Sequence, residues 1–310
     1  MNTKKFMDDQ IKAIRDEVGN GTAVNALSGG VDSAVVTLLG YRALGTRMKT
    51  YFVDTALMRM NEPEEVARIF ARLRVPITLV DARTDFLRAL RGLTDPEEKR
   101  KAVSETFYAK VFGKLVRKSR ARFLMHGTIL TDIEESVAGI KRQHNILFQL
   151  GIKPEETYGY SILEPLKTLR KNEVRKVAAA LGLPPELAQR MPFPGPGLAT
   201  RIIGEVTAKK LEIVRQANAI VEKELAGCGA FQYFAALLED RATGIRNGKR
   251  EFGQMIVVRC VNSVDARTAT ASRVPWARLE KISQSITAIP GINRCLYDLT
   301  PKPPATIEYI

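Results

Sequence analysis

Short apolar runs alternate with stretches of helical spacing along the first part of the chain. The strand-like runs lie at 22–27, 49–54, 77–81 and 122–127, and helical spacing covers the N-terminus, 33–44, 62–73 and 97–119. Strands that alternate with helices in this way pack as a parallel sheet with helices on both faces. The pattern therefore predicts a doubly wound α/β fold.

The pattern changes character near residue 200. A strand at 161–163 and a helix at 171–181 are followed by Met-Pro-Phe-Pro-Gly-Pro-Gly-Leu-Ala at 191–199, whose three prolines and two glycines exclude regular structure. Beyond it, helical spacing at 208–225 and 276–288 and strand-like runs at 255–261 and 294–299 predict a smaller α+β domain. We expect one domain at 1–200 and a second at 201–310, with the proline-rich segment as a rigid connector.

Composition narrows the cellular setting. The apolar runs, such as 177–183, are far shorter than the roughly 18 residues of a membrane span. The N-terminus lacks the apolar core of a signal peptide. Cys228, Cys260 and Cys295 lie far apart, which favours neither a disulfide framework nor a zinc site. We expect a soluble cytoplasmic protein that does not bind a membrane.

The formal net charge of +14 leaves two kinds of anionic partner open. Basic proteins bind nucleic acids through counterion release, but the same charge suits a polyphosphate substrate. The basic residues are spread along the chain apart from a cluster at 110–122, and no basic tract interleaved with aromatic residues occurs. A nucleic-acid partner is therefore not the interpretation that we favour.

The loop Ser28-Gly29-Gly30-Val31-Asp32-Ser33 follows the first strand and opens a helix. Backbone N–H groups and the helix dipole point at an anion in that position, so phosphate is the expected guest. The glycines permit close approach, the serine hydroxyls can donate to phosphate oxygens, and Asp32 can hold Mg²⁺. The alternative is an ordinary turn in which Asp32 is a first-turn acid. The chain has no GxxxxGK[ST] loop of the common nucleoside triphosphatases.

This loop resembles the SGGVDS loop of the N-type ATP pyrophosphatases, which holds the two phosphates that leave as pyrophosphate. Further segments resemble the GMP synthetase family across essentially the whole chain. They are Asp95-Pro-Glu-Glu-Lys-Arg-Lys101, Gly127-Thr-Ile with Asp132 and Glu135-Ser136, Pro192-Phe-Pro-Gly-Pro-Gly-Leu-Ala199 and Lys302-Pro-Pro-Ala-Thr-Ile-Glu308. The resemblance implies an adenine nucleotide α-hydrolase-like fold followed by a dimerisation domain that completes the substrate site.

The resemblance also implies a reaction. ATP with Mg²⁺ would adenylate xanthosine monophosphate, and ammonia would displace AMP to give GMP and pyrophosphate. A glutaminase domain does not fit before Ser28, and Cys228 lies in Ala-Gly-Cys-Gly-Ala, which lacks the outer glycines of a nucleophile elbow. The chain therefore resembles the separate synthetase subunit typical of archaea, which receives ammonia from a partner glutaminase subunit and forms a homodimer.

The resemblance assigns several residues to the ATP site. Asp132 and Glu135 share one helix face if their segment is helical, with a solvated acidic turn as the alternative. Lys141 and His144 lie in Ile-Lys-Arg-Gln-His-Asn at 140–145, which corresponds to the family's lid segment. Gln143 stands where the family has a histidine, and the usual glycine-rich continuation is absent. His144 can equally be an ordinary surface or core residue.

Two more groups of residues complete the expected site. Val53 and Asp54 end the second strand, where sheet order places nucleotide contacts, although buried strand ends also carry such residues for structural reasons. For xanthosine monophosphate the resemblance implies the C-terminal segment, and there Lys302 suits a phosphate and Glu308 a purine. The expected contacts in the acceptor site are Arg100, Lys302, Thr306, Ile307 and Glu308. For Arg100 the alternative is a solvated helix charge.

Two rival functions remain open from the sequence. The charge and the shared loop also suit an ATP pyrophosphatase that modifies transfer RNA. The altered segment at 140–151 also suits a GMP synthetase paralogue with a different acceptor or with no catalysis, acting as a nucleotide-binding or partner-binding module.

Overall fold

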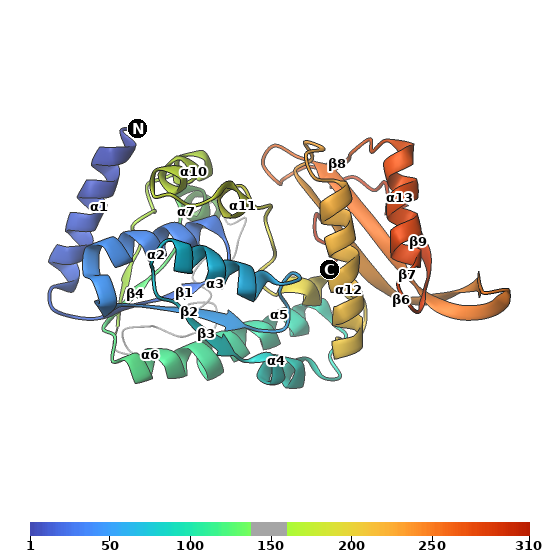
Figure 1. Ribbon diagram of the computed structural model, residues 1–310, viewed down its shortest axis with the longest axis horizontal. Coiled ribbons are helices and arrows are strands. Elements are labelled where there is room, and N and C mark those ends of the chain that lie inside the picture. The colour runs from blue at the N-terminus through green and yellow to red at the C-terminus, as the bar shows by residue number, and fades with distance from the viewer. Residues whose placement is uncertain (138–159) are drawn as a thin grey trace. The chain divides into compact units, whose positions relative to one another are not determined.

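The computed structural model describes residues 1–137 and 160–310, and for 135–137 it describes the backbone alone. The chain forms two compact units (Figure 1). Unit 1 comprises Met1–Asp54, Asn61–Ala82 and Ser104–Arg190, and unit 2 comprises Thr55–Met60, Arg83–Val103 and Met191–Ile310. The expected functional division at residue 200 stays a prediction.

Unit 1 is built on a sheet of five strands in the order β3-β2-β1-β4-β5. All neighbouring strands are parallel. The strands are β1 (Ala23–Leu27), β2 (Met48–Asp54), β3 (Thr78–Asp81), β4 (Phe123–Met125) and β5 (Ser161–Leu163). This sheet confirms the doubly wound α/β fold, and it places the carboxyl ends of all five strands at one edge.

Helices cover the sheet of unit 1 on both faces. In Figure 1, α2 and α10 lie on one side of it and α6 lies on the other. The helices are α1 (Thr3–Val18), α2 (Val31–Leu44), α3 (Glu62–Arg72), α6 (Gly113–Ser119), α7 (Leu130–Val137), α10 (Lys171–Ala180) and α11 (Pro185–Ala188), with a 3₁₀ turn η1 (Gly45–Arg47). Most of α2 is buried, as its nearly continuous apolar sequence requires.

A π-helical segment, η2 (Thr106–Phe112), divides the helix that was expected over 97–119. Inside it the rings of Phe107 and Phe112 stack with their centroids 5.7 Å apart. Phe112 belongs to a buried cluster with Val24, Val116, Leu124 and Tyr160. The local widening of the helix thus points aromatic side chains at the sheet, which a uniform helical spacing does not predict.

Unit 2 is an α+β unit around a four-stranded sheet. β7 pairs antiparallel with β6 and β8 and parallel with β9. The strands are β6 (Gln232–Arg246), β7 (Lys249–Asn262), β8 (Thr270–Ala271) and β9 (Ile292–Asp298); the helical segments are α4 (Arg83–Leu90), α5 (Pro96–Glu105), η3 (Gly197–Arg201), α12 (Ala208–Glu224) and α13 (Trp276–Thr287). β6 and α4 had no sequence prediction. Within the described ranges, no helix has the length and apolarity to cross a membrane.

The proline-rich segment packs closely inside unit 2. Gly197 has a φ of +61°, and a Cβ there would lie 2.3 Å from the carbonyl oxygen of Leu57. The next residue, Leu198, donates its N–H to the same oxygen at 2.8 Å. Only glycine fits this approach, so the segment is held in place by contact with residues 55–60.

Candidate active site

The loop between β1 and α2 is held by its own hydroxyl groups. The Ser28 N–H donates to Ser33 Oγ at 3.1 Å, and the Ser33 hydroxyl lies 3.1 Å from the Gly30 carbonyl, to which it donates. Gly30 is the N-cap of α2 and offers no side-chain cap. The first N–H groups of a helix have no partner within it, so this end of α2 presents donors to an anion.

Gly29 lies against a buried ion pair. Its φ is +76°, and a Cβ there would lie 2.6 Å from Glu62 Oε1. The Glu62 side chain is 3% exposed and is paired with Arg190 at 2.7 Å. A glycine is therefore required at this position by both backbone conformation and space. The arginine compensates a carboxylate that would otherwise repel phosphate.

Asp32, in the first turn of α2, is paired with Lys171, the first residue of α10. Lys171 Nζ lies 2.5 Å from Asp32 Oδ2. Burial raises the pKa of Asp32, while the charges of Lys171 and, more weakly, Arg175 oppose that rise. Asp32 Oδ1 is buried and has no hydrogen-bond partner in the part of the chain that the structure describes. Such an orphaned oxygen is a free acceptor for a cation or a donor.

Asp132 acts on the same carboxylate. Its charge raises the pKa of Asp32 further, and its Oδ2 accepts the Ile129 N–H at 3.0 Å at the start of α7. Gly127, just after β4, packs on Asp32, because a Cβ there would lie 3.3 Å from Asp32 Cβ. The carboxyl ends of β1 and β4 thus bring Asp32 and Asp132 together.

The remaining residues expected in the ATP site are placed less fully. Val53 pairs with Val80, one residue beyond the last β1–β2 pair, and its side chain is buried. The Asp54 carbonyl accepts the Ala82 N–H at 2.9 Å. Glu135 lies in α7, as expected, but its side chain is outside the description. Lys141 and His144 lie outside the described residues.

A polar cluster at the ends of β4 and β5 was not predicted from the sequence. Thr128 Oγ1 donates to Glu164 Oε1 at 2.6 Å, and His126 Nδ1 lies 2.8 Å from the same hydroxyl. These residues follow β4 and β5 at the edge of the sheet that carries the loop. Position after a strand was a usable signal for them, but their mutual contact was not visible in the sequence.

In unit 2, Glu308 is held by a buried arginine. Arg201 Nη2 and Nε donate to its two carboxylate oxygens at 3.0 and 3.2 Å, and Gln232 Nε2 donates to Oε1. The Arg201 side chain is 1% exposed, and it also donates to Asn218 Oδ1 at 2.7 Å. This bidentate geometry fixes the carboxylate and leaves it 17% exposed.

A second buried arginine fixes the backbone just before Glu308. Arg259 donates to the Thr306 carbonyl at 2.7 Å and to the Ile307 carbonyl at 3.0 Å, and it pairs with Asp298 at 2.6 Å. Burial alone would raise the pKa of Asp298, but hydrogen bonds from Thr300 and the Arg259 charge lower it. The C-terminal segment is therefore an ordered part of unit 2.

The two expected phosphate contacts of the acceptor site have different settings. Lys302 Nζ donates to the Ala266 carbonyl at 2.8 Å, so its ammonium is partly engaged. Arg100 lies on α5, is exposed and pairs with Glu97 at 2.9 Å. An exposed pair of this kind contributes little to stability, so Arg100 can turn toward a ligand at small cost.

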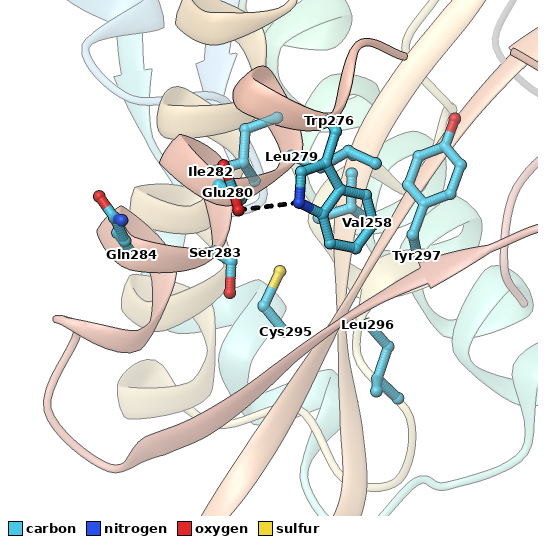
Figure 2. A pocket seen from close by; sticks show the side chains of 10 residues that line it. All are labelled: Val258, Trp276, Leu279, Glu280, Ile282, Ser283, Gln284, Cys295, Leu296 and Tyr297. Carbon is cyan, nitrogen blue, oxygen red and sulfur yellow. Dashed lines mark hydrogen bonds between the residues drawn. The ribbon is translucent and has the colours of Figure 1, made fainter. Parts of the chain in front are cut away.

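A pocket of about 410 Å³ lies between α13 and β9 in unit 2 (Figure 2). Trp276 covers it and donates to Glu280 at 2.8 Å, while Cys295 points into it from β9. Burial raises the pKa of the Cys295 thiol to about 11, so it is not a reactive thiolate near neutral pH. None of the site residues expected from the sequence lines this pocket.

The donor set suits Mg²⁺ bound jointly with phosphate. Among residues 1–137 and 160–310 no cluster of three His, Cys, Asp or Glu side chains could hold a metal alone. Mg²⁺ is commonly bound by one or two carboxylates together with substrate phosphates, and Asp32 offers a buried oxygen without a partner beside an anion-binding helix end. The residues present therefore fit the ion.

Fold and loop together define the class of protein. The NAD synthase family matches residues 3–195, and the GMP synthase C terminal domain matches residues 218–309. A chain with this pair of matches joins an ATP pyrophosphatase unit to the C-terminal unit of GMP synthases. An NH3-dependent NAD synthetase of known structure from Campylobacter jejuni aligns with 63% of this chain and 80% of its own, with a TM-score of 0.46 and 17% identity.

Relatives identify the family within that class. A subunit of GMP synthase [glutamine-hydrolyzing] from Archaeoglobus fulgidus is 49% identical over the whole of both chains. The protein of the same name from Pyrococcus abyssi is 46% identical, again over the whole of both chains. This chain belongs to that family of GMP synthase subunits. The family expected from the sequence motifs is confirmed, and it is favoured over an enzyme that modifies transfer RNA.

Proposed function

We propose that the chain is the synthetase subunit of a two-chain GMP synthase. It converts ATP, xanthosine monophosphate and ammonia to AMP, pyrophosphate and GMP. The observation that carries this proposal is Asp32, whose buried orphan oxygen lies at the open N-terminus of α2 in a chain that matches GMP synthase subunits from end to end. The site combines an anion-binding helix end with a carboxylate placed for a cation.

The loop directs cleavage between the α- and β-phosphates. Ser28, Gly29, Gly30, Val31 and Ser33 surround the outer two phosphates of ATP, which leave together as pyrophosphate. Lys171 and Arg175, which already act on Asp32, supply positive charge on the same side. When bound, Mg²⁺ neutralises charge on the phosphates and is held by Asp32 and phosphate oxygens. Asp132 and Glu135 on α7 complete the acidic side, and Val53 and Asp54 contact the nucleoside.

The chemistry has two steps. The purine carbonyl oxygen of xanthosine monophosphate attacks the α-phosphorus, and the bond to pyrophosphate breaks. Ammonia then attacks the same purine carbon, and AMP leaves with the oxygen. Lys141 and His144 have the family's assigned place near the reacting phosphate. Orientation and electrostatic stabilisation are enough for both steps, so no covalent enzyme intermediate is required.

The acceptor site lies in unit 2. Glu308, preset by Arg201, accepts hydrogen bonds from the purine, and the backbone of Thr306 and Ile307 flanks it. Lys302 and Arg100 bind the phosphate of the nucleotide. The rigidity of this segment supports the assignment, because a fixed carboxylate discriminates purines by their donors.

Ammonia comes from a separate glutaminase subunit. The relatives are named as one subunit of a glutamine-hydrolysing GMP synthase, which supports a two-chain arrangement. We further propose that the part of the chain beyond residue 200 mediates a homodimer. Analytical ultracentrifugation of the pure chain tests this, with a monomer at micromolar concentration as the result against it.

One assay tests the function. Pyrophosphate release from Mg²⁺-ATP is measured with and without xanthosine monophosphate and ammonium, and GMP is looked for by chromatography. We expect release that depends on the acceptor, AMP as the spent nucleotide, and no turnover with glutamine replacing ammonium. Recovery of ADP, or tight salt-sensitive binding of transfer RNA with no response to the acceptor, would overturn the proposal.

A further inference from the structure

Lys99 is a buried lysine that the proposed reaction does not use. Its residue is 1% exposed, and its Nζ donates to the Ile202 carbonyl at 2.8 Å. Burial and the nearby Lys210 lower its pKa to about 8, while Glu239 and Asp95 oppose that shift. A lysine is very seldom buried to this degree without a specific partner, so its position calls for a reason.

The bond joins two segments that each carry an expected acceptor contact or its support. Lys99 lies next to Arg100 on α5, in the Asp95-Pro-Glu-Glu-Lys-Arg-Lys101 motif. Ile202 follows Arg201, whose guanidinium holds both oxygens of Glu308. A single hydrogen bond thus stands between the helix of Arg100 and the support of Glu308.

Both ends of this bond are anchored. Asp95 caps α5 by accepting the Glu97 and Glu98 N–H groups at 2.9 Å. On the other side, Ile202 is fully buried and bridges to Leu237 of β6, whose carbonyl accepts the Ile203 N–H at 2.9 Å. Neither end can shift freely, so the bond transmits position from one segment to the other.

We propose that Lys99 is a positioning residue that sets the separation between Arg100 and Glu308, and so the fit of the acceptor nucleotide. The inference rests on the proposed function, in which these two residues bind the phosphate and the purine of one molecule. A ligand held at both ends needs a fixed distance between its contacts. Lys99 does not touch the nucleotide itself.

The test compares Lys99→Met with the wild type. Methionine keeps most of the buried stem and loses the donor to Ile202. With ammonium as nitrogen source, we expect KM for xanthosine monophosphate to rise roughly tenfold or more, the effect of losing a charged hydrogen bond. KM for ATP should stay within about twofold, because the ATP contacts lie in unit 1. Lys101→Met, next but one on the same helix, is the matched control, and its KM values should match the wild type.

A second variant guards against a folding defect. Lys99→Arg retains a long cationic donor, so it should restore part of the acceptor affinity if position is the role. Circular dichroism and thermal unfolding establish that each variant is folded. An unchanged KM for the acceptor, an equal rise of both KM values, or loss of fold in both variants would overturn the inference. Failure of the proposed function itself would appear separately, as a wild type that does not respond to xanthosine monophosphate.

Discussion

The phosphate loop of unit 1 and the acceptor segment of unit 2 are built in opposite ways. The loop takes its shape from six consecutive residues between β1 and α2, whose own serines close it. The acceptor segment takes its shape from Arg201 and Arg259, buried arginines that lie far away in the sequence. Chemistry is therefore exposed and local in one region, whereas in the other it depends on the surrounding fold.

The difference predicts how each region responds to substitution. A change in the loop should remove activity and leave the fold, because the loop's polar groups face a ligand. A change in the buried supports of the acceptor segment should affect both the fold and binding, because it leaves a charge without its partner. Four measurements test this contrast.

Asp32→Ala should have the largest effect. Removing the carboxylate that is proposed to hold Mg²⁺ should lower pyrophosphate release by at least about a hundredfold. Thermal unfolding should change little, since the Asp32–Lys171 pair is partly exposed. Asp16→Ala, an exposed acid on α1, is the control and should retain full activity. An Asp32→Ala protein that still releases pyrophosphate at the wild-type rate would remove the loop from the mechanism.

Arg201→Met should affect fold and binding together. It leaves the Glu308 carboxylate without its bidentate partner, and breaking such a pair typically costs about 3–5 kcal/mol. Urea unfolding measures the stability, and calorimetry measures acceptor binding, which should fall below detection. Arg278→Met, an exposed arginine on α13, should change neither. If Arg201→Met lost binding without losing stability, the two regions would be more alike than their construction indicates.

Lys171→Met should have an intermediate effect confined to the loop. The variant loses a positive charge beside the phosphates, which should lower kcat/KM for ATP by about ten- to a hundredfold. Its acceptor affinity should be unchanged. Lys176→Met, exposed on the same helix, provides the matched comparison. Wild-type use of ATP by Lys171→Met would show that the pair with Asp32 serves the fold alone.

The smallest effect concerns the pH dependence of stability at Lys99. Its pKa is about 8 in the folded chain against 10.5 for an ordinary lysine, so folding disfavours its proton. Between these pH values the unfolded chain binds more protons than the folded one, and stability from this group rises with pH. The free energy of unfolding of the wild type, relative to Lys99→Met, should therefore increase from pH 8 to 10.5. A difference that is flat or falls with pH would contradict the burial of a charged lysine.

Several parts of the site could be predicted because their geometry is local. The Ser28–Ser33 loop lies between a strand and a helix, so its anion-binding end follows from the order of elements. Helical spacing likewise placed Asp132 and Glu135 on α7. The π-helical segment and β6 were not predicted, because a break in helical geometry and a long partly exposed strand leave no clear periodicity.

The partners of the predicted residues were out of reach. Lys171 is 139 residues from Asp32, and Arg201 is 107 residues from Glu308. Each was readable only as a helix start or as part of a connector. No local pattern in one sequence indicates which distant charges meet.

By itself, the sequence determined the parallel sheet, the phosphate loop and the family, because strand and helix periods and glycine-rich turns act over a few neighbouring residues. Only the tertiary structure decided which lysine faces Asp32, which arginine presents Glu308, and that α4 and most of α5 belong to the C-terminal unit. The physical reason is that a buried charge must find a compensating partner, and packing across the whole chain selects that partner.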